Sequence, residues 1–190
     1  MAIVLFDNER RKSLFPLTTT KAVADLRWGI LKIKEWWQYY FPEQTIYIFT
    51  EDYLKPLYPE IPTEEHIWID ASVLPNEDLL HKIVGLALNN ALADEFGLIA
   101  GKATINSNSF TTINALSYFE IIIDTAKAKR LQECYELFQW NGDVFKQQFS
   151  LVTKGKISQP ISNTNTVFSK ENIFIEEGAV VECCILNATD

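Results

Sequence analysis

Long apolar runs, dense basic runs and paired cysteines are all missing from this chain of 190 residues. No run approaches the roughly eighteen apolar residues of a membrane span, and the opening MAIVLFDNERRK lacks the basic region and apolar core of a signal peptide. The net charge is −8, and no basic stripe suits a nucleic acid. We therefore expect a cytoplasmic protein without membrane or nucleic-acid partners.

Cysteine and histidine are also scarce. Cys134, Cys183 and Cys184 are odd in number and form no metal-ligand spacing, which predicts reduced thiols. His66 and His81 have no serine or cysteine partner at a diagnostic spacing, so we interpret both as structural. These absences argue against a disulfide scaffold, a zinc site and a Ser–His or Cys–His hydrolase.

Apolar residues make up 47% of the chain, enough for a sizeable core. The run Ala2–Phe6 predicts a strand buried on both faces. A polar loop follows, and apolar residues at three- and four-residue steps predict a helix over residues 23–40. In open α/β folds such a loop lies at the carboxyl end of the first strand, where ligands bind. A helix N-terminus there would suit an anion.

The rest of the chain predicts an α/β fold with a mixed or mostly parallel sheet. Further strands are expected at residues 45–50 and 67–69, and a hairpin at 91–103. Helices are expected from residue 76 or 77 to 83, over 114–138 and near 145–149, with a turn at 138–143. We interpret the cations of the 114–138 helix, Lys127, Lys129 and Arg130, as a solvated face.

The last segment has a different pattern. Residues 158–166 are rich in Ser, Thr and Asn and predict an extended linker. Ile175, Val181 and Asn187 then recur every six positions, as in the coils of a parallel β-helix. We expect one domain over residues 1–165, followed by a linker and the start of a truncated β-helix over 166–190.

Several long motifs together resemble a known family. They are LFDNERR, PLTTTKAVADLRWGIL, IDASVLPNEDL, LIAGK, FQWNGD and TKGKISQPISNTNTVFSKENIFIEEGAVVECCILN. The chain resembles a divergent branch of the bacterial sugar-1-phosphate nucleotidyltransferases fused to a left-handed β-helix acyltransferase. That branch is UDP-N-acetylglucosamine diphosphorylase/glucosamine-1-phosphate N-acetyltransferase-like.

The resemblance implies a Rossmann-like nucleotidyltransferase fold, followed by the first coils of a left-handed parallel β-helix. It implies that a sugar 1-phosphate attacks the α-phosphorus of UTP or dTTP and releases pyrophosphate, assisted by Mg²⁺. It also implies a role in cell envelope biosynthesis and a homotrimer formed through the missing β-helix. The chemistry needs cations at the phosphates and a carboxylate for the metal.

The first loop departs from the better-known nucleotidyltransferases. Better-known members carry a glycine-rich LAAGxGTR loop, but LFDNERRKSLFPLTTTK contains no glycine. Without glycine the backbone cannot readily adopt the positive-φ turns that form an anion-binding nest. Side chains must then bind the phosphate. The candidates are Arg10, Arg11, Thr18, Thr20, Lys21 and Arg27. The alternative is a catalytically degenerate domain that binds a sugar nucleotide or regulates the β-helix acyltransferase.

Lys21 and Arg27 are the preferred catalytic contacts to phosphate, although a surface Arg27 could instead pair with Asp25 or Glu35. Asp25 is a further candidate for substrate binding. Asn141 and Gly142 could contact the sugar, but Asn-Gly is first of all a turn former. Asp70 ends a buried strand and Asp7 follows one, so both are candidate Mg²⁺ ligands; each could equally be a helix cap or turn residue.

Overall fold

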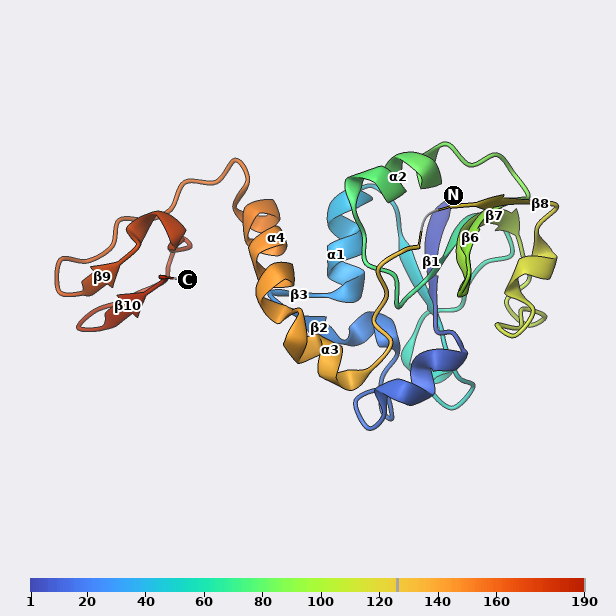
Figure 1. Ribbon diagram of the computed structural model, residues 1–190, viewed down its shortest axis with the longest axis horizontal. Coiled ribbons are helices and arrows are strands. Elements are labelled where there is room, and N and C mark those ends of the chain that lie inside the picture. Colours follow the sequence, from blue (N-terminus) through green and yellow to red (C-terminus); the bar gives the residue numbers. More distant parts are fainter. Residues whose placement is uncertain (126, 190) are drawn as a thin grey trace. The chain divides into compact units, whose positions relative to one another are not determined.

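The computed structural model describes residues 1–125 and 127–189 and divides the chain into two compact units, Met1–Gln148 and Phe149–Asp190 (Figure 1). The first unit contains a six-stranded sheet. In sheet order its strands are β4 (Ile46–Phe49), β1 (Ala2–Phe6), β5 (Glu65–Asp70), β7 (Gly97–Thr104), β6 (Asn90–Asp94) and β8 (Ile121–Asp124). Only β7 runs antiparallel to its neighbours among these strands. The predicted mixed, mostly parallel sheet of an α/β fold is confirmed.

Strand β1 lies inside the sheet, and all five of its residues are buried. Side chains alternate along a strand, so Val4 and Phe6 share one face. There they join an apolar cluster with Trp68 and Phe110. In Figure 1 the segment that joins β7 to β8 and helix α1 (Ile33–Tyr40) lie on opposite sides of β1. The sheet therefore has a core on each face.

Local patterns predicted several elements correctly. Helix α2 (Glu77–Val84) begins after Asn76, whose side-chain oxygen accepts from the Leu79 N–H at 2.9 Å. Strands β6 and β7 form the expected hairpin. Short 3₁₀ segments complete this unit: η1 (Glu9–Leu14), η2 (Val23–Asp25), η3 (Lys55–Leu57) and η4 (Ala115–Tyr118).

The helix predicted over residues 23–40 is wrong in its first half. That part forms η2 and a small hairpin of β2 (Arg27–Trp28) and β3 (Leu31–Lys32), and α1 begins only at Ile33. Gly29 turns the chain at φ +70°, a conformation that a right-handed helix excludes. The Gln148 Oε1 atom accepts from the N–H groups of Ile30 and Leu31 at 2.8 and 3.0 Å. A distant side chain thus replaces the helical hydrogen bonds.

The long helix predicted over residues 114–138 is also wrong. Its middle is the edge strand β8, which pairs in parallel with β6, and its end is α3 (Cys134–Gln139). Consecutive isoleucines at 121–123 favour a strand because β-branched side chains lose freedom in a helix. The turn expected at residues 138–143 is confined to Trp140, between α3 and α4 (Asn141–Thr153). Helix α4 contains the helical piece expected near 145–149.

In the second unit, β9 (Thr166–Phe168) and β10 (Ile185–Asn187) pair in parallel, and η5 (Lys170–Asn172) lies between them in sequence. Next to this pair, Asn165 Oδ1 accepts from the N–H of Cys184, nineteen residues further along, at 2.9 Å. After β9 the chain therefore turns back and runs through β10 in the same direction. Further coils of a β-helix stay a prediction.

Candidate active site

The carboxyl ends of the parallel strands meet at one edge of the sheet. Asp7 follows β1, Thr50 follows β4, Asp70 ends β5 and Asp94 ends β6. A cavity of about 480 Å³ opens at this edge. It is lined by Phe6, Asn8, Glu9, Arg10, Asp70, residues 96–98 and residues 112–117. Open α/β sheets bind ligands at this edge, so the cavity is the candidate active site.

Arg10 supplies the positive charge of this cavity. It is the only Lys or Arg among the described residues that line it. Asn8 caps η1 and accepts from the Arg10 N–H at 2.8 Å, and the guanidinium lies 4.7 Å from the centre of the Phe96 ring. The Nη1 atom of Arg10 is buried without a hydrogen-bond partner. A buried donor without an acceptor costs free energy, so an anionic oxygen would be bound favourably here.

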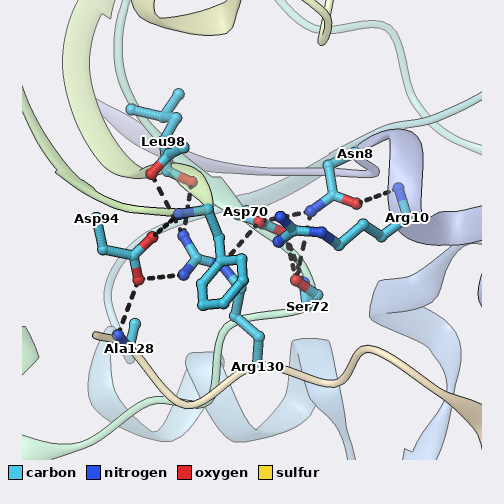
Figure 2. Close-up of polar contacts among 10 residues, drawn as sticks. Asn8, Arg10, Asp70, Ser72, Asp94, Leu98, Ala128 and Arg130 are labelled. Carbon is cyan, nitrogen blue, oxygen red and sulfur yellow. Dashed lines mark hydrogen bonds and ion pairs between the residues drawn. The ribbon is translucent and has the colours of Figure 1, made fainter.

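Arg130 lies at the centre of a buried polar cluster next to Arg10 (Figure 2). Its Nε donates to Asp70 Oδ2 at 3.3 Å, and its Nη1 donates to Asp94 Oδ2. The Arg130 side chain is 0% exposed. Arg130 was expected on a solvated helix face, and this expectation is wrong because residue 130 lies on an extended segment.

Asp94 stays ionised within this cluster. Burial alone would raise the pKa of Asp94, but hydrogen bonds from Arg130 and from the N–H groups of Ala128 and Phe96 outweigh it and lower the pKa. Ala128 donates at 2.9 Å and Phe96 at 2.9 Å. Through these two hydrogen bonds the Asp94 carboxylate stabilises both the β6–β7 turn and the segment before α3.

A second buried ion pair holds the first loop. Arg11 Nε lies 3.1 Å from Asp7 Oδ2, and the Arg11 guanidinium also donates to the Tyr53 hydroxyl at 2.9 Å and to the Thr18 carbonyl. The Thr18 hydroxyl donates back to the Arg11 carbonyl at 3.0 Å. Both Arg11 and Thr18 were candidates for phosphate binding, but in this structure their polar groups are engaged within the protein.

The other predicted residues lie apart from the cavity. Thr20, Lys21 and Arg27 are exposed, and Arg27 donates to the Ile30 carbonyl in its own hairpin. The α-helix N-terminus expected beside Lys21 does not exist, because residues 23–25 form a single 3₁₀ turn. The structure thus brings together Arg10, Asp70 and Asp7 at the sheet edge and leaves the two preferred cations outside.

Asp25, Asn141 and Gly142 stabilise local structure. Asp25 pairs with Lys34 at 2.7 Å and accepts from the Tyr58 hydroxyl at 2.6 Å. Asn141 Oδ1 accepts from the Gly29 N–H at 3.1 Å, and Gly142 lies in the first turn of α4. None of the three lines the 480 Å³ cavity.

Residues 3–157 match the family model described as sugar nucleotidyl transferase. The chain belongs to the sugar nucleotidyl transferase family. No curated protein matches it. Among the described residues of the chain, no helix has the length and apolar character needed to cross a membrane.

The carboxylates of this family member do not fit a bound Mg²⁺ as they stand. Asp70 Oδ1 accepts from the N–H and hydroxyl of Ser72 at 2.9 and 2.7 Å, while Oδ2 accepts from Asn8 at 2.6 Å and from Arg130. Asp7 accepts from the Val23 N–H and the Thr50 hydroxyl besides pairing with Arg11. Over residues 1–125 and 127–189, no group of three or more His, Cys, Asp or Glu could hold a metal.

Asp7 makes the stability of the protein depend on pH. Burial raises the pKa of Asp7 to about 6 from its ordinary 3.8, because hydrogen bonds from Thr50 and Val23 and the charge of Arg11 offset burial only in part. The folded protein therefore binds a proton below pH 6 that the unfolded chain binds only near pH 4. Protonation of Asp7 therefore raises the free energy of unfolding by about 3 kcal/mol. This contribution is fully present below about pH 4 and is lost as the pH rises through 6.

We expect the free energy of unfolding of wild type, relative to Asp7→Asn, to fall by about 3 kcal/mol between pH 4 and pH 7. Urea unfolding of both proteins across this range measures the difference. The lowered pKa values of Asp25 and Asp94 act in the opposite direction but are common to both proteins, so they cancel. If the free energy of unfolding of wild type, relative to Asp7→Asn, instead rises with pH, the raised pKa of Asp7 is contradicted.

Sequence reasoning missed Arg130 and undervalued Arg10. Arg130 contacts carboxylates 60 and 36 residues earlier in the chain, a separation that no local pattern reveals. One signal was available: a buried strand that ends in aspartate requires a cationic or hydrogen-bonding partner. Arg10 was identified as a candidate, but the sequence could not separate it from Arg11, its neighbour in the loop.

Proposed function

We propose that the first unit transfers a nucleotidyl group from a nucleoside triphosphate to a sugar 1-phosphate. An oxygen of the sugar 1-phosphate attacks the α-phosphorus and forms a new P–O bond. The bond from the α-phosphorus to its bridging oxygen breaks, and pyrophosphate leaves with the electron pair. UTP or dTTP and N-acetylglucosamine 1-phosphate are the proposed substrates, and the product would serve cell envelope biosynthesis.

The observation that carries this proposal is the partner-free end of Arg10 in the cavity at the sheet edge. Such chemistry depends mainly on positioning and charge stabilisation, and Arg10 is held by both Asn8 and the Phe96 ring. The cavity would receive the phosphates. We assign Mg²⁺ to the substrate, as the Mg²⁺–triphosphate complex, and give it no protein ligand.

An adjoining cavity of about 320 Å³ is the proposed position of the sugar. It shares Asn8, Glu9, Thr112 and Ile113 with the first cavity, so two ligands could lie next to each other. Hydroxyl, amide and carboxylate groups of Ser107, Asn108, Thr111, Glu51 and Asp52 line it. These groups suit the hydroxyls of a sugar. Lys55 also lines this cavity, and its ammonium group pairs with Asp52 at 2.6 Å.

A second candidate is a catalytically degenerate domain that binds a sugar nucleotide or regulates a β-helix acyltransferase. The engagement of Asp7, Asp70 and Arg11 within the protein favours it, since these groups are not free for catalysis. The parallel strands of the second unit support the related proposal that residues 166–190 begin a left-handed β-helix. The full-length protein would then be a homotrimer formed through later coils.

Pyrophosphate release separates the two candidates. The chain is mixed with N-acetylglucosamine 1-phosphate, Mg²⁺ and UTP or dTTP, with ATP as the control nucleotide. Pyrophosphate formed in proportion to enzyme concentration supports the transferase. A melting-temperature rise with UDP-N-acetylglucosamine but no pyrophosphate supports the degenerate domain. If neither response is observed, the transferase and the sugar-nucleotide-binding domain are both rejected.

A further inference from the structure

The guanidinium of Arg130 lies in a cage of four oxygen atoms (Figure 2). Asp70 Oδ2 and Asp94 Oδ2 accept from Nε and Nη1. The carbonyl oxygens of Leu98 and Gly97 accept from Nη2 at 3.2 and 3.4 Å. The four acceptors belong to the end of β5, the end of β6 and the start of β7. Neighbouring strands of one sheet thus converge on a single cation.

This set of donors is the one that hard metal cations prefer. Carboxylate and carbonyl oxygens bind Mg²⁺, Mn²⁺ and Ca²⁺ in proteins. Two buried carboxylates at one position also repel each other unless a positive charge separates them. The oxygens are therefore arranged as a cation site, and the cation in it is a side chain of the same protein.

We propose that Arg130 is a built-in cation that occupies the place of a divalent metal ion between Asp70 and Asp94. Through this contact it also positions the Arg10 loop: Asp70 accepts from Asn8 Nδ2 at 2.6 Å, and Asn8 Oδ1 accepts from the Arg10 N–H at 2.8 Å. These contacts within the protein hold the loop. This proposal concerns the protein without nucleotide, so it does not rest on the proposed function.

The first test uses wild type and Asp70→Asn with Mn²⁺ alone, and follows the EPR signal of the free ion. Arg130 fills the cage, so both proteins should leave the signal of free Mn²⁺ equally unchanged. The proposal is overturned if wild type binds one Mn²⁺ and Asp70→Asn abolishes that binding. This comparison needs no change at Arg130.

The second test is Arg130→Ala, which removes the guanidinium and leaves the four oxygens and a space. It should gain one Mn²⁺ site, which Asp94→Asn in the same chain should remove. At a Mn²⁺ concentration one hundred times the dissociation constant, its melting temperature should rise by roughly 5–10 °C. Lys129→Ala is the matched control, because it removes the neighbouring exposed cation and should gain no site.

A folded Arg130→Ala protein that neither binds Mn²⁺ nor gains thermal stability from it would overturn the proposal. A variant that folds only when Mn²⁺ is present would support it. If Arg130→Ala does not fold with or without Mn²⁺, the comparison of wild type with Asp70→Asn decides. Binding of one Mn²⁺ by wild type that Asp70→Asn abolishes would still overturn the proposal.

Discussion

Replacing Arg10 with glutamine is expected to weaken binding of the Mg²⁺–triphosphate complex about ten- to a hundredfold. A hydrogen bond to a charged group contributes about 1.5–3 kcal/mol, and 1.4 kcal/mol corresponds to a factor of ten. Arg10 has a buried nitrogen without a partner and is the only Lys or Arg among the described residues of the cavity wall. Isothermal titration of UTP into wild type and variant measures the change.

The matched controls are Lys21→Gln and Arg27→Gln, each of which removes one exposed cation from the same region. Both should bind the triphosphate as wild type does. The melting temperature of unliganded Arg10→Gln should stay within a few degrees of wild type, because its contact with the Phe96 ring is worth about 0.5–1 kcal/mol. If the controls lose affinity and Arg10→Gln keeps it, the phosphates bind at Lys21 and Arg27 instead.

Replacing Arg11 with methionine is expected to lower the free energy of unfolding at pH 7 by about 3–5 kcal/mol, because it leaves Asp7 buried without its ion pair. Arg11 is 2% exposed, and its guanidinium also bonds Tyr53 and the Thr18 carbonyl. For a chain of this length the melting temperature should fall by roughly 6–20 °C. Thermal or urea unfolding measures the loss.

The pH distinguishes loss of the ion pair from loss of packing. Burial raises the pKa of Asp7 to about 6, so at pH 5 the carboxyl is protonated and no charge remains to be compensated. The effect of Arg11→Met should therefore be smaller at pH 5 than at pH 7. Lys12→Met removes a neighbouring exposed cation and should change stability little at either pH. An equal loss at both pH values would assign the effect of Arg11 to packing.

The parts of the fold that could be predicted are those that local pattern determines. The apolar run Ala2–Phe6 predicts a buried strand because such a strand needs no polar face. Asn76 marks the start of α2 because its side chain caps the helix. The β6–β7 hairpin follows from short apolar segments on either side of a turn. In each case the pattern that predicts the element lies within a short stretch of the sequence.

The parts that could not be predicted depend on distant partners. Residues 23–32 have helical periodicity, yet Gln148 and Asn141 supply acceptors that stabilise a hairpin there. Residues 121–123 lie in a helical pattern, yet pairing with β6 makes them a strand. At the site, Arg10 and Arg11 are adjacent in sequence, and only the fold shows that one faces a cavity and the other a buried carboxylate.

The contact between Gln148 and the β2–β3 hairpin can form only after residue 148 has been synthesised, so the first unit completes its fold late in translation. The acceptor for the Ile30 N–H is 118 residues further along the chain. Contacts of such long range form late, because closing the intervening chain costs entropy before any bond is made. While residues 32–147 are being synthesised, the hairpin cannot reach its final form. The N–H groups of residues 30 and 31 therefore lack their final acceptor until Gln148 has left the exit tunnel.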